Sequence, residues 1–162
     1  MAPHLSSRHV SSLGRKALLL MIPLNLLLTV WVWIGRLVFG VFGWFGLVLA
    51  PVALVLLVAL LVTTILAFTQ EGRPRALTGF QAGAQVVTWL GMLVFGTFLP
   101  DFGDTEDSHI SLLTQVFGHD DAMLSLSYTI ATVAALVTVV AYVVLLVSLT
   151  AARRKATAAV PA

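Results

Sequence analysis

Residues 47–68 read LVLAPVALVLLVALLVTTILAF and contain no charged side chain. A helix needs about 20 predominantly apolar residues to cross the hydrocarbon core of a bilayer. This stretch meets that requirement and therefore predicts a transmembrane helix.

Three further apolar runs flank this stretch, at about residues 17–36, 79–99 and 124–150. The first run follows a basic start, as in a cleavable signal peptide, but it is too long for an ordinary h-region and no A-x-A site follows it. We therefore interpret it as an uncleaved helix. The predicted fold is an all-α, integral membrane four-helix bundle over residues 17–150.

The composition supports a lipid environment. Hydrophobic residues make up 59% of the chain and charged residues 10%, whereas a soluble domain carries roughly 25% charged residues. Most of the surface must therefore face lipid. The chain has no cysteine, which excludes disulfides and Cys-ligated metal or iron–sulfur sites.

The basic residues flank the apolar runs and do not form one patch, which argues against nucleic-acid binding. Basic residues near helix ends concentrate on the cytoplasmic side. Eight of the nine fall on one side of the predicted bundle: Arg8, Arg15, Lys16, Arg73, Arg75, Arg153, Arg154 and Lys155. We predict a multi-pass plasma-membrane protein with the N-terminal segment 1–16 and the basic tail 151–162 in the cytoplasm. The acidic loop 100–123 would then lie outside.

The sequence contains an internal similarity. Residues 33–42 read WIGRLVFGVF and residues 89–98 read WLGMLVFGTF, with seven of ten positions identical. Both copies fall at the outer end of an odd-numbered predicted helix. We infer a duplicated two-helix hairpin, a 2+2 repeat of the kind frequent in transporters.

Arg36 is the one basic residue predicted on the outer side. It aligns with Met92 in the repeat, which places it near or below the membrane interface, where a charge is costly. It can snorkel to lipid phosphate, contact an anion or substrate, or pair with a carboxylate. We favour snorkelling or pairing. The candidate partners are Asp101, Asp104, Glu106 and Asp107.

The outer loop offers no strong metal motif. Its acidic residues and His109 and His119 match neither an EF-hand loop nor H-E-x-x-H, so a solvated loop or a patch facing a cationic partner is favoured. Asp107 or Ser108 is expected to cap a short helix that ends at Gly118. Its apolar face would lie on the membrane surface or a partner, or pack over the bundle.

Small residues form two seams that let helices approach closely in lipid. The first is Gly79, Gly83 and Gly91. The second runs along residues 124–150 and consists of Ser127, Ala131, Ala134, Thr138 and Ala141. Packing within the bundle is the favoured interpretation, and packing against another subunit is the alternative.

Reactive groups are absent from the four predicted spans, which hold no Asp, Glu, Lys or His. This disfavours proton-coupled transport and excludes a bis-histidine haem inside the bundle. No P-loop or nucleophile–base pair occurs, so we predict no catalytic residue, metal or cofactor. Polar residues such as Asn25 and Gln85 are expected to form interhelical hydrogen bonds.

Two functions fit these observations. The first is a non-catalytic accessory or structural subunit of a larger bacterial plasma-membrane complex, with the lipid bilayer and other membrane subunits as partners. The second is a small-molecule transporter or channel component, which the repeat and Arg36 suggest. An enzyme acting at the outer surface would rest on the acidic loop alone.

Overall fold

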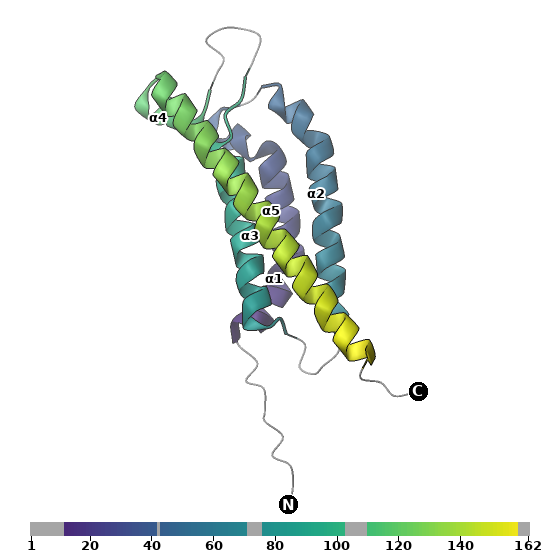
Figure 1. The fold of residues 1–162 in the computed structure, drawn as a ribbon. Coiled ribbons are helices and arrows are strands. Elements are labelled where there is room, and N and C mark those ends of the chain that lie inside the picture. Colours follow the sequence, from purple (N-terminus) through teal and green to yellow (C-terminus); the bar gives the residue numbers. More distant parts are fainter. Residues whose placement is uncertain (1–11, 42, 71–75, 103–109, 159–162) are drawn as a thin grey trace, which may run out of the picture.

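A computed structural model describes residues 12–41, 43–70, 76–102 and 110–158, and this part of the chain is almost wholly helical (Figure 1). One isolated antiparallel bridge joins Asp101 and Ile110. The elements in order are α1 (Ser12–Ile34), the 3-10 helix η1 (Gly35–Phe39), α2 (Phe45–Phe68), α3 (Gly79–Phe98), α4 (Leu112–Phe117) and α5 (Asp121–Ala158).

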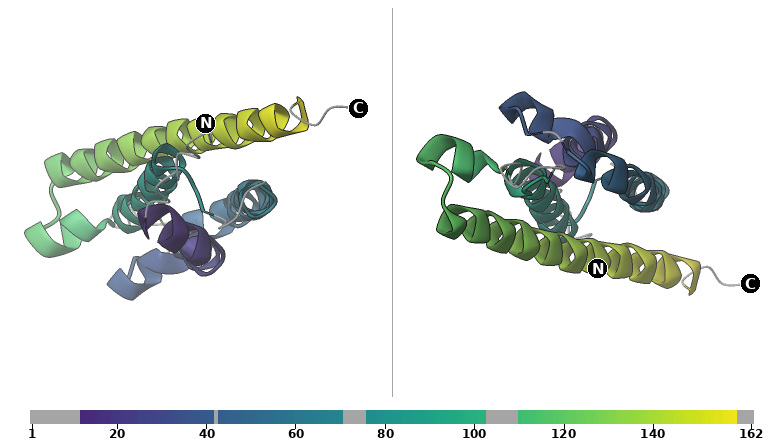
Figure 2. Two further views of the ribbon diagram at one scale, coloured as in Figure 1. Left: turned by 90° about the horizontal axis from the view of Figure 1, so that it is seen from below. Right: turned by 90° about the horizontal axis from the view of Figure 1, so that it is seen from above.

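Three helical stretches of the described chain are long and apolar enough to cross a membrane. They are Ser12–Phe39, which joins α1 to η1, then α2, and Asp121–Lys155 within α5. α3 forms where the third span was predicted, but it does not reach this class, because glutamines and glycines lower its hydropathy. α3 instead lies between α1 and α5, while α2 packs mainly against α1 (Figure 2).

α5 is much longer than the predicted span 124–150. Its 38 residues extend about 57 Å at 1.5 Å per residue, and the helix crosses the bundle diagonally (Figure 1). It begins at Asp121 because the Asp120 carboxylate accepts a hydrogen bond from the N–H of Ala122 at 3.1 Å. At the other end, the predicted tail is helical through Ala158, since alanine is the strongest helix former.

The ends of the other helices have local causes. α1 tightens into η1, which stops at Gly40, whose positive φ of 71° favours glycine. α3 begins with a capping box between Thr78 and Gln81. α4 begins after Ser111, which forms a second capping box with Thr114. The helix therefore starts later than expected, since the cap was predicted at residues 107–108, which lie outside the described residues; its end at Gly118 is as predicted.

The two copies of the internal similarity adopt different conformations. The described residues of the first copy, 33–41, leave α1, pass through η1 and reach the turn at Gly40, whereas residues 89–98 are continuous α-helix in α3. Arg36 and Met92 are both buried, but Arg36 lies against a carboxylate, whereas Met92 belongs to the hydrophobic core. The duplication thus finds no support in the local conformation and stays a prediction from sequence.

Candidate functional site

A buried ion pair closes the end of the bundle that carries α4. Nη1 of Arg36 lies 3.3 Å from Oδ2 of Asp101, and the two side chains are 2% and 3% exposed. The guanidinium also lies over the ring of Phe45, 5.8 Å from its centroid. Arg36 is therefore enclosed by protein. It does not snorkel toward lipid phosphate, one of the roles considered for it.

The same carboxylate organises the backbone around it. Oδ1 of Asp101 accepts hydrogen bonds from the N–H groups of Phe45 at 3.0 Å and Phe102 at 2.9 Å. A Cβ atom at Gly43 would collide with the carbonyl oxygen of Phe102, so only glycine fits there. Asp101 thus links η1, the start of α2 and the segment that follows α3.

The other predicted partners of Arg36 cannot be compared with Asp101. Asp104, Glu106 and Asp107 fall in residues 103–109, which lie outside the described residues. Sequence reasoning could not choose among the four carboxylates. The one local signal was that Asp101 directly follows Pro100, where α3 has just ended.

A second polar cluster lies deep inside the bundle and centres on Asn25 of α1. Its amide donates to the hydroxyl of Thr64 in α2 at 3.0 Å. Its Oδ1 accepts from Nε2 of Gln85 at 3.2 Å and from Nε1 of Trp89 at 2.8 Å, both in α3. All four side chains are buried. We call these four residues the amide hub, because one asparagine joins three helices.

The amide hub has no ionisable group, so it cannot carry protons. Its polar atoms are satisfied by one another except Oε1 of Gln85, which has no donor within the described part of the chain. An unsatisfied polar group in lipid is costly, and mutual hydrogen bonds remove most of that cost. The hub therefore fixes which faces of α1, α2 and α3 meet.

Some residues of the two predicted seams pack against neighbouring helices, and others face open space. A Cβ atom at Gly91 would collide with the hydroxyl of Thr138, so α3 and α5 approach closely there. Ser127 is buried and donates a hydrogen bond to Ser111 at 2.9 Å. Ala131, Ala134 and Ala141 of the second seam are also buried. In contrast, a Cβ at Gly79 or Gly83 would meet nothing within 4 Å.

An apolar groove runs along the outside of the α3–α5 contact. It consists of two open hollows of about 560 and 410 Å³, which share Val87 and Val137. Gly83 and Gly91 are among the residues of α3 that line it, and α5 contributes several valines. We call this feature the α3–α5 groove. Almost all of its lining is apolar.

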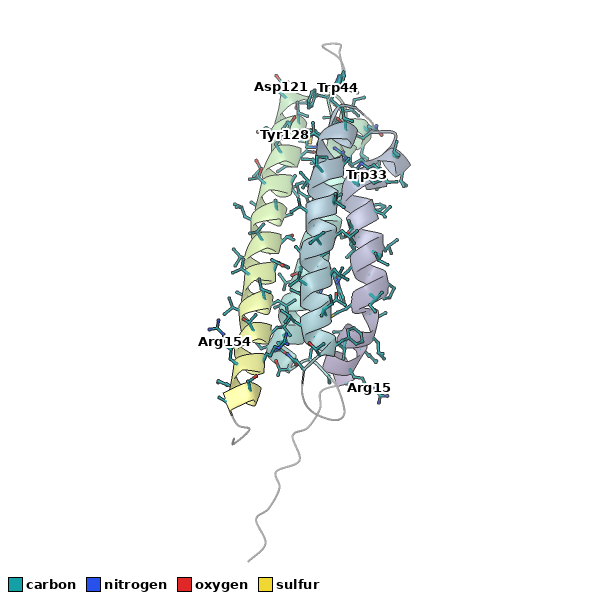
Figure 3. All side chains as sticks on the ribbon, turned by 90° about the vertical axis from the view of Figure 1, so that its right-hand side faces the viewer. Arg15, Trp33, Trp44, Asp121, Tyr128 and Arg154 are labelled. Atoms are coloured by element: carbon teal, nitrogen blue, oxygen red, sulfur yellow. The ribbon has the colours of Figure 1, made fainter. Side chains whose placement is uncertain are left out.

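Tryptophan side chains join neighbouring helices through hydrogen bonds to backbone carbonyls. The indole N–H groups of Trp31 and Trp33 donate to the carbonyls of Leu93 and Gly46, at 3.1 and 2.9 Å. Trp33 and Trp44 lie at the same end of the molecule as Asp121, whereas Arg15 and Arg154 lie at the opposite end (Figure 3). One end of the molecule therefore carries tryptophans and an aspartate, and the opposite end carries arginines.

Comparisons with known proteins add no assignment. No protein-family model, curated protein or solved structure matches the chain. In the part of the chain that the structure describes, no three His, Asp or Glu side chains come together as a metal site. The groove, the hub and the distribution of charge are therefore the features of the molecule that bear on its function.

Proposed function

We propose that this chain is a four-span protein of a bacterial plasma membrane, with both termini in the cytoplasm, and a non-catalytic accessory subunit of a larger membrane complex. α3 has 20 residues, or about 30 Å at 1.5 Å per residue, which is enough to cross the hydrocarbon core. The start of α1 and the end of α5 lie at the same end of the bundle, the end that carries Arg15 and Arg154 (Figure 3).

The α3–α5 groove is the observation that carries the accessory role. Helices associate in lipid where small residues allow close approach, because there is no hydrophobic force between them. Gly83 is such a residue, and among the described residues no side chain occupies the space above it. The groove continues toward Val94 and Ile130, so a partner helix can follow it across much of the membrane.

The test is purification of the tagged chain in mild detergent, followed by mass spectrometry of what accompanies it. We expect one or more integral membrane proteins at fixed stoichiometry. Gly83→Leu should release them, because the new side chain fills the groove. Gly79→Leu is the matched control, since it lies one turn away on α3, is equally open and does not line the groove.

A wild-type chain isolated as a stable monomer or homodimer would contradict the accessory role. The alternative, a transporter or channel component, rests on the internal similarity and on Arg36. The burial of Arg36 against Asp101 leaves no exposed cation for a substrate at that position. Solute flux into liposomes that contain only this chain is the measurement that would favour the alternative.

A further inference from the structure

A basic hollow lies between α2 and α5 at the end opposite the Arg36–Asp101 pair. It is open, measures about 530 Å³ and is lined by Leu66 of α2 and by Thr150, Arg153, Arg154, Thr157 and Ala158 of α5. Figure 3 shows Arg154 at the end of the bundle that also carries Arg15. Among the described residues, no carboxylate lies within ion-pair distance of either arginine of the hollow.

The end of α2 indicates where this hollow lies relative to the membrane surface. Leu66 lies in the last turn of α2, which ends at Phe68, and α2 is uncharged throughout. The end of an uncharged membrane-length helix marks the boundary between hydrocarbon and water. α5 continues past this level, so Arg153 and Arg154 lie at the height of lipid headgroups.

The chemistry of the hollow matches a phosphodiester. Arginine presents a planar fork of N–H donors that fits phosphate oxygens in a bidentate manner. The end of α2 would ordinarily present free carbonyls and a partial negative charge. Here the hydroxyl of Thr69 donates to the carbonyls of Ile65 and Leu66, at 2.8 and 3.3 Å, and weakens that negative potential.

The membrane side of the hollow is apolar. Residues three or four apart on a helix share a face, so Val147 and Val143 continue the stripe of α5 that begins with Arg154 and Thr150. Both valines are about half exposed. A molecule held at the arginines would therefore extend an acyl chain along α5.

We propose that this hollow is a binding site for an anionic phospholipid. The phosphodiester lies between Arg153 and Arg154, and an acyl chain runs past Leu66 and along Val147 and Val143. Basic pockets between transmembrane helices at a membrane surface bind anionic headgroups in this way. The proposal needs the helices to span a bilayer, but it is independent of any partner subunit and of which leaflet the hollow faces.

The test uses the full-length protein in nanodiscs made of phosphatidylglycerol and phosphatidylcholine. After extraction into mild detergent, native mass spectrometry measures the lipid that stays bound. We expect retained phosphatidylglycerol in the wild type. Arg153→Gln/Arg154→Gln should lower its preference over phosphatidylcholine about 30-fold, at about 1 kcal/mol for each basic residue. Leu66→Trp keeps both charges but fills the hollow, and it should abolish retention.

The matched control is Arg15→Gln/Lys16→Gln, which removes the same charge at the same end but outside the hollow. It should keep the lipid. Equal losses in the two double variants would mean general attraction to a basic surface and would overturn the site. Retention by Leu66→Trp, or displacement of the lipid by soluble glycerol phosphate, would also overturn it. Thermal unfolding of each variant separates loss of the lipid from loss of the fold.

Discussion

Asn25→Leu is the substitution that most directly tests how this bundle is held together. The wild-type side chain makes three hydrogen bonds to two other helices, to Thr64, Gln85 and Trp89. Leucine has the same branched arrangement of side-chain heavy atoms, although its methyl groups are bulkier, and it suits lipid at least as well. The change therefore removes the hydrogen bonds while keeping the branched shape of the side chain.

The expected loss follows from the number of bonds. Interhelical hydrogen bonds in membrane proteins contribute about 0.6 kcal/mol each on average, so the three together account for about 2 kcal/mol. The donors of Gln85 and Trp89 then stay buried without an acceptor, which raises the cost toward about 4 kcal/mol. Leucine gains little in return, because both folded and separated helices lie in lipid.

The assay is reversible unfolding in mixed micelles, in which SDS is titrated against a mild detergent and tryptophan fluorescence reports the transition. Thr132→Val is the matched control, because Thr132 is a polar residue of α5 that faces outward. Asn25→Leu/Gln85→Leu should cost less than the sum of its single variants, since both singles break one shared bond. A loss below about 0.5 kcal/mol for Asn25→Leu, typical of a surface substitution, would refute the reasoning.

Three further predictions concern the ends and seams of the bundle. Arg36→Met should destabilise the protein by about 3 to 5 kcal/mol because it leaves Asp101 buried and unpaired. In the double variant Arg36→Met/Asp101→Asn, unfolding measurements should show that over half of this lost unfolding free energy is recovered. Gly91→Ala should cost about 1 to 3 kcal/mol by overpacking against α5, whereas Gly79→Ala should change the unfolding free energy by less than about 1 kcal/mol; similar values for the two would contradict the seam. The chain has no cysteine, so Val116→Cys and Thr157→Cys can each be labelled alone, and we expect maleimide to reach them from opposite sides of the membrane.

The sequence was informative wherever the physical signal is local. Uncharged apolar runs located α2 to within two residues at its start and located α3 to within one at its end. The basic cluster at 153–155 indicates the end of a membrane span, but it does not indicate the end of the helix, which continues to Ala158. The alanines around that cluster favour helix and are the local signal for this extension.

The candidate sites depend on contacts between distant residues, which no local pattern reveals. Asn25 and Gln85 were each expected to form a hydrogen bond between helices. Their separation of 60 residues gave no indication that they meet, or that Trp89 joins them. The basic hollow was likewise hidden, because Leu66 and Arg153 come together only through the way α5 crosses α2.

The position of α3 has a consequence for how the protein is made. As this helix leaves the ribosome, its glutamines and glycines make its insertion into the bilayer as a single helix unfavourable. α1 and α2 are synthesised earlier, so Asn25 is already in place when Gln85 and Trp89 emerge. Biogenesis should therefore be ordered, with the first hairpin acting as an internal chaperone for the third helix. A chain that starts after α2 should fail at insertion before any defect in assembly could be seen.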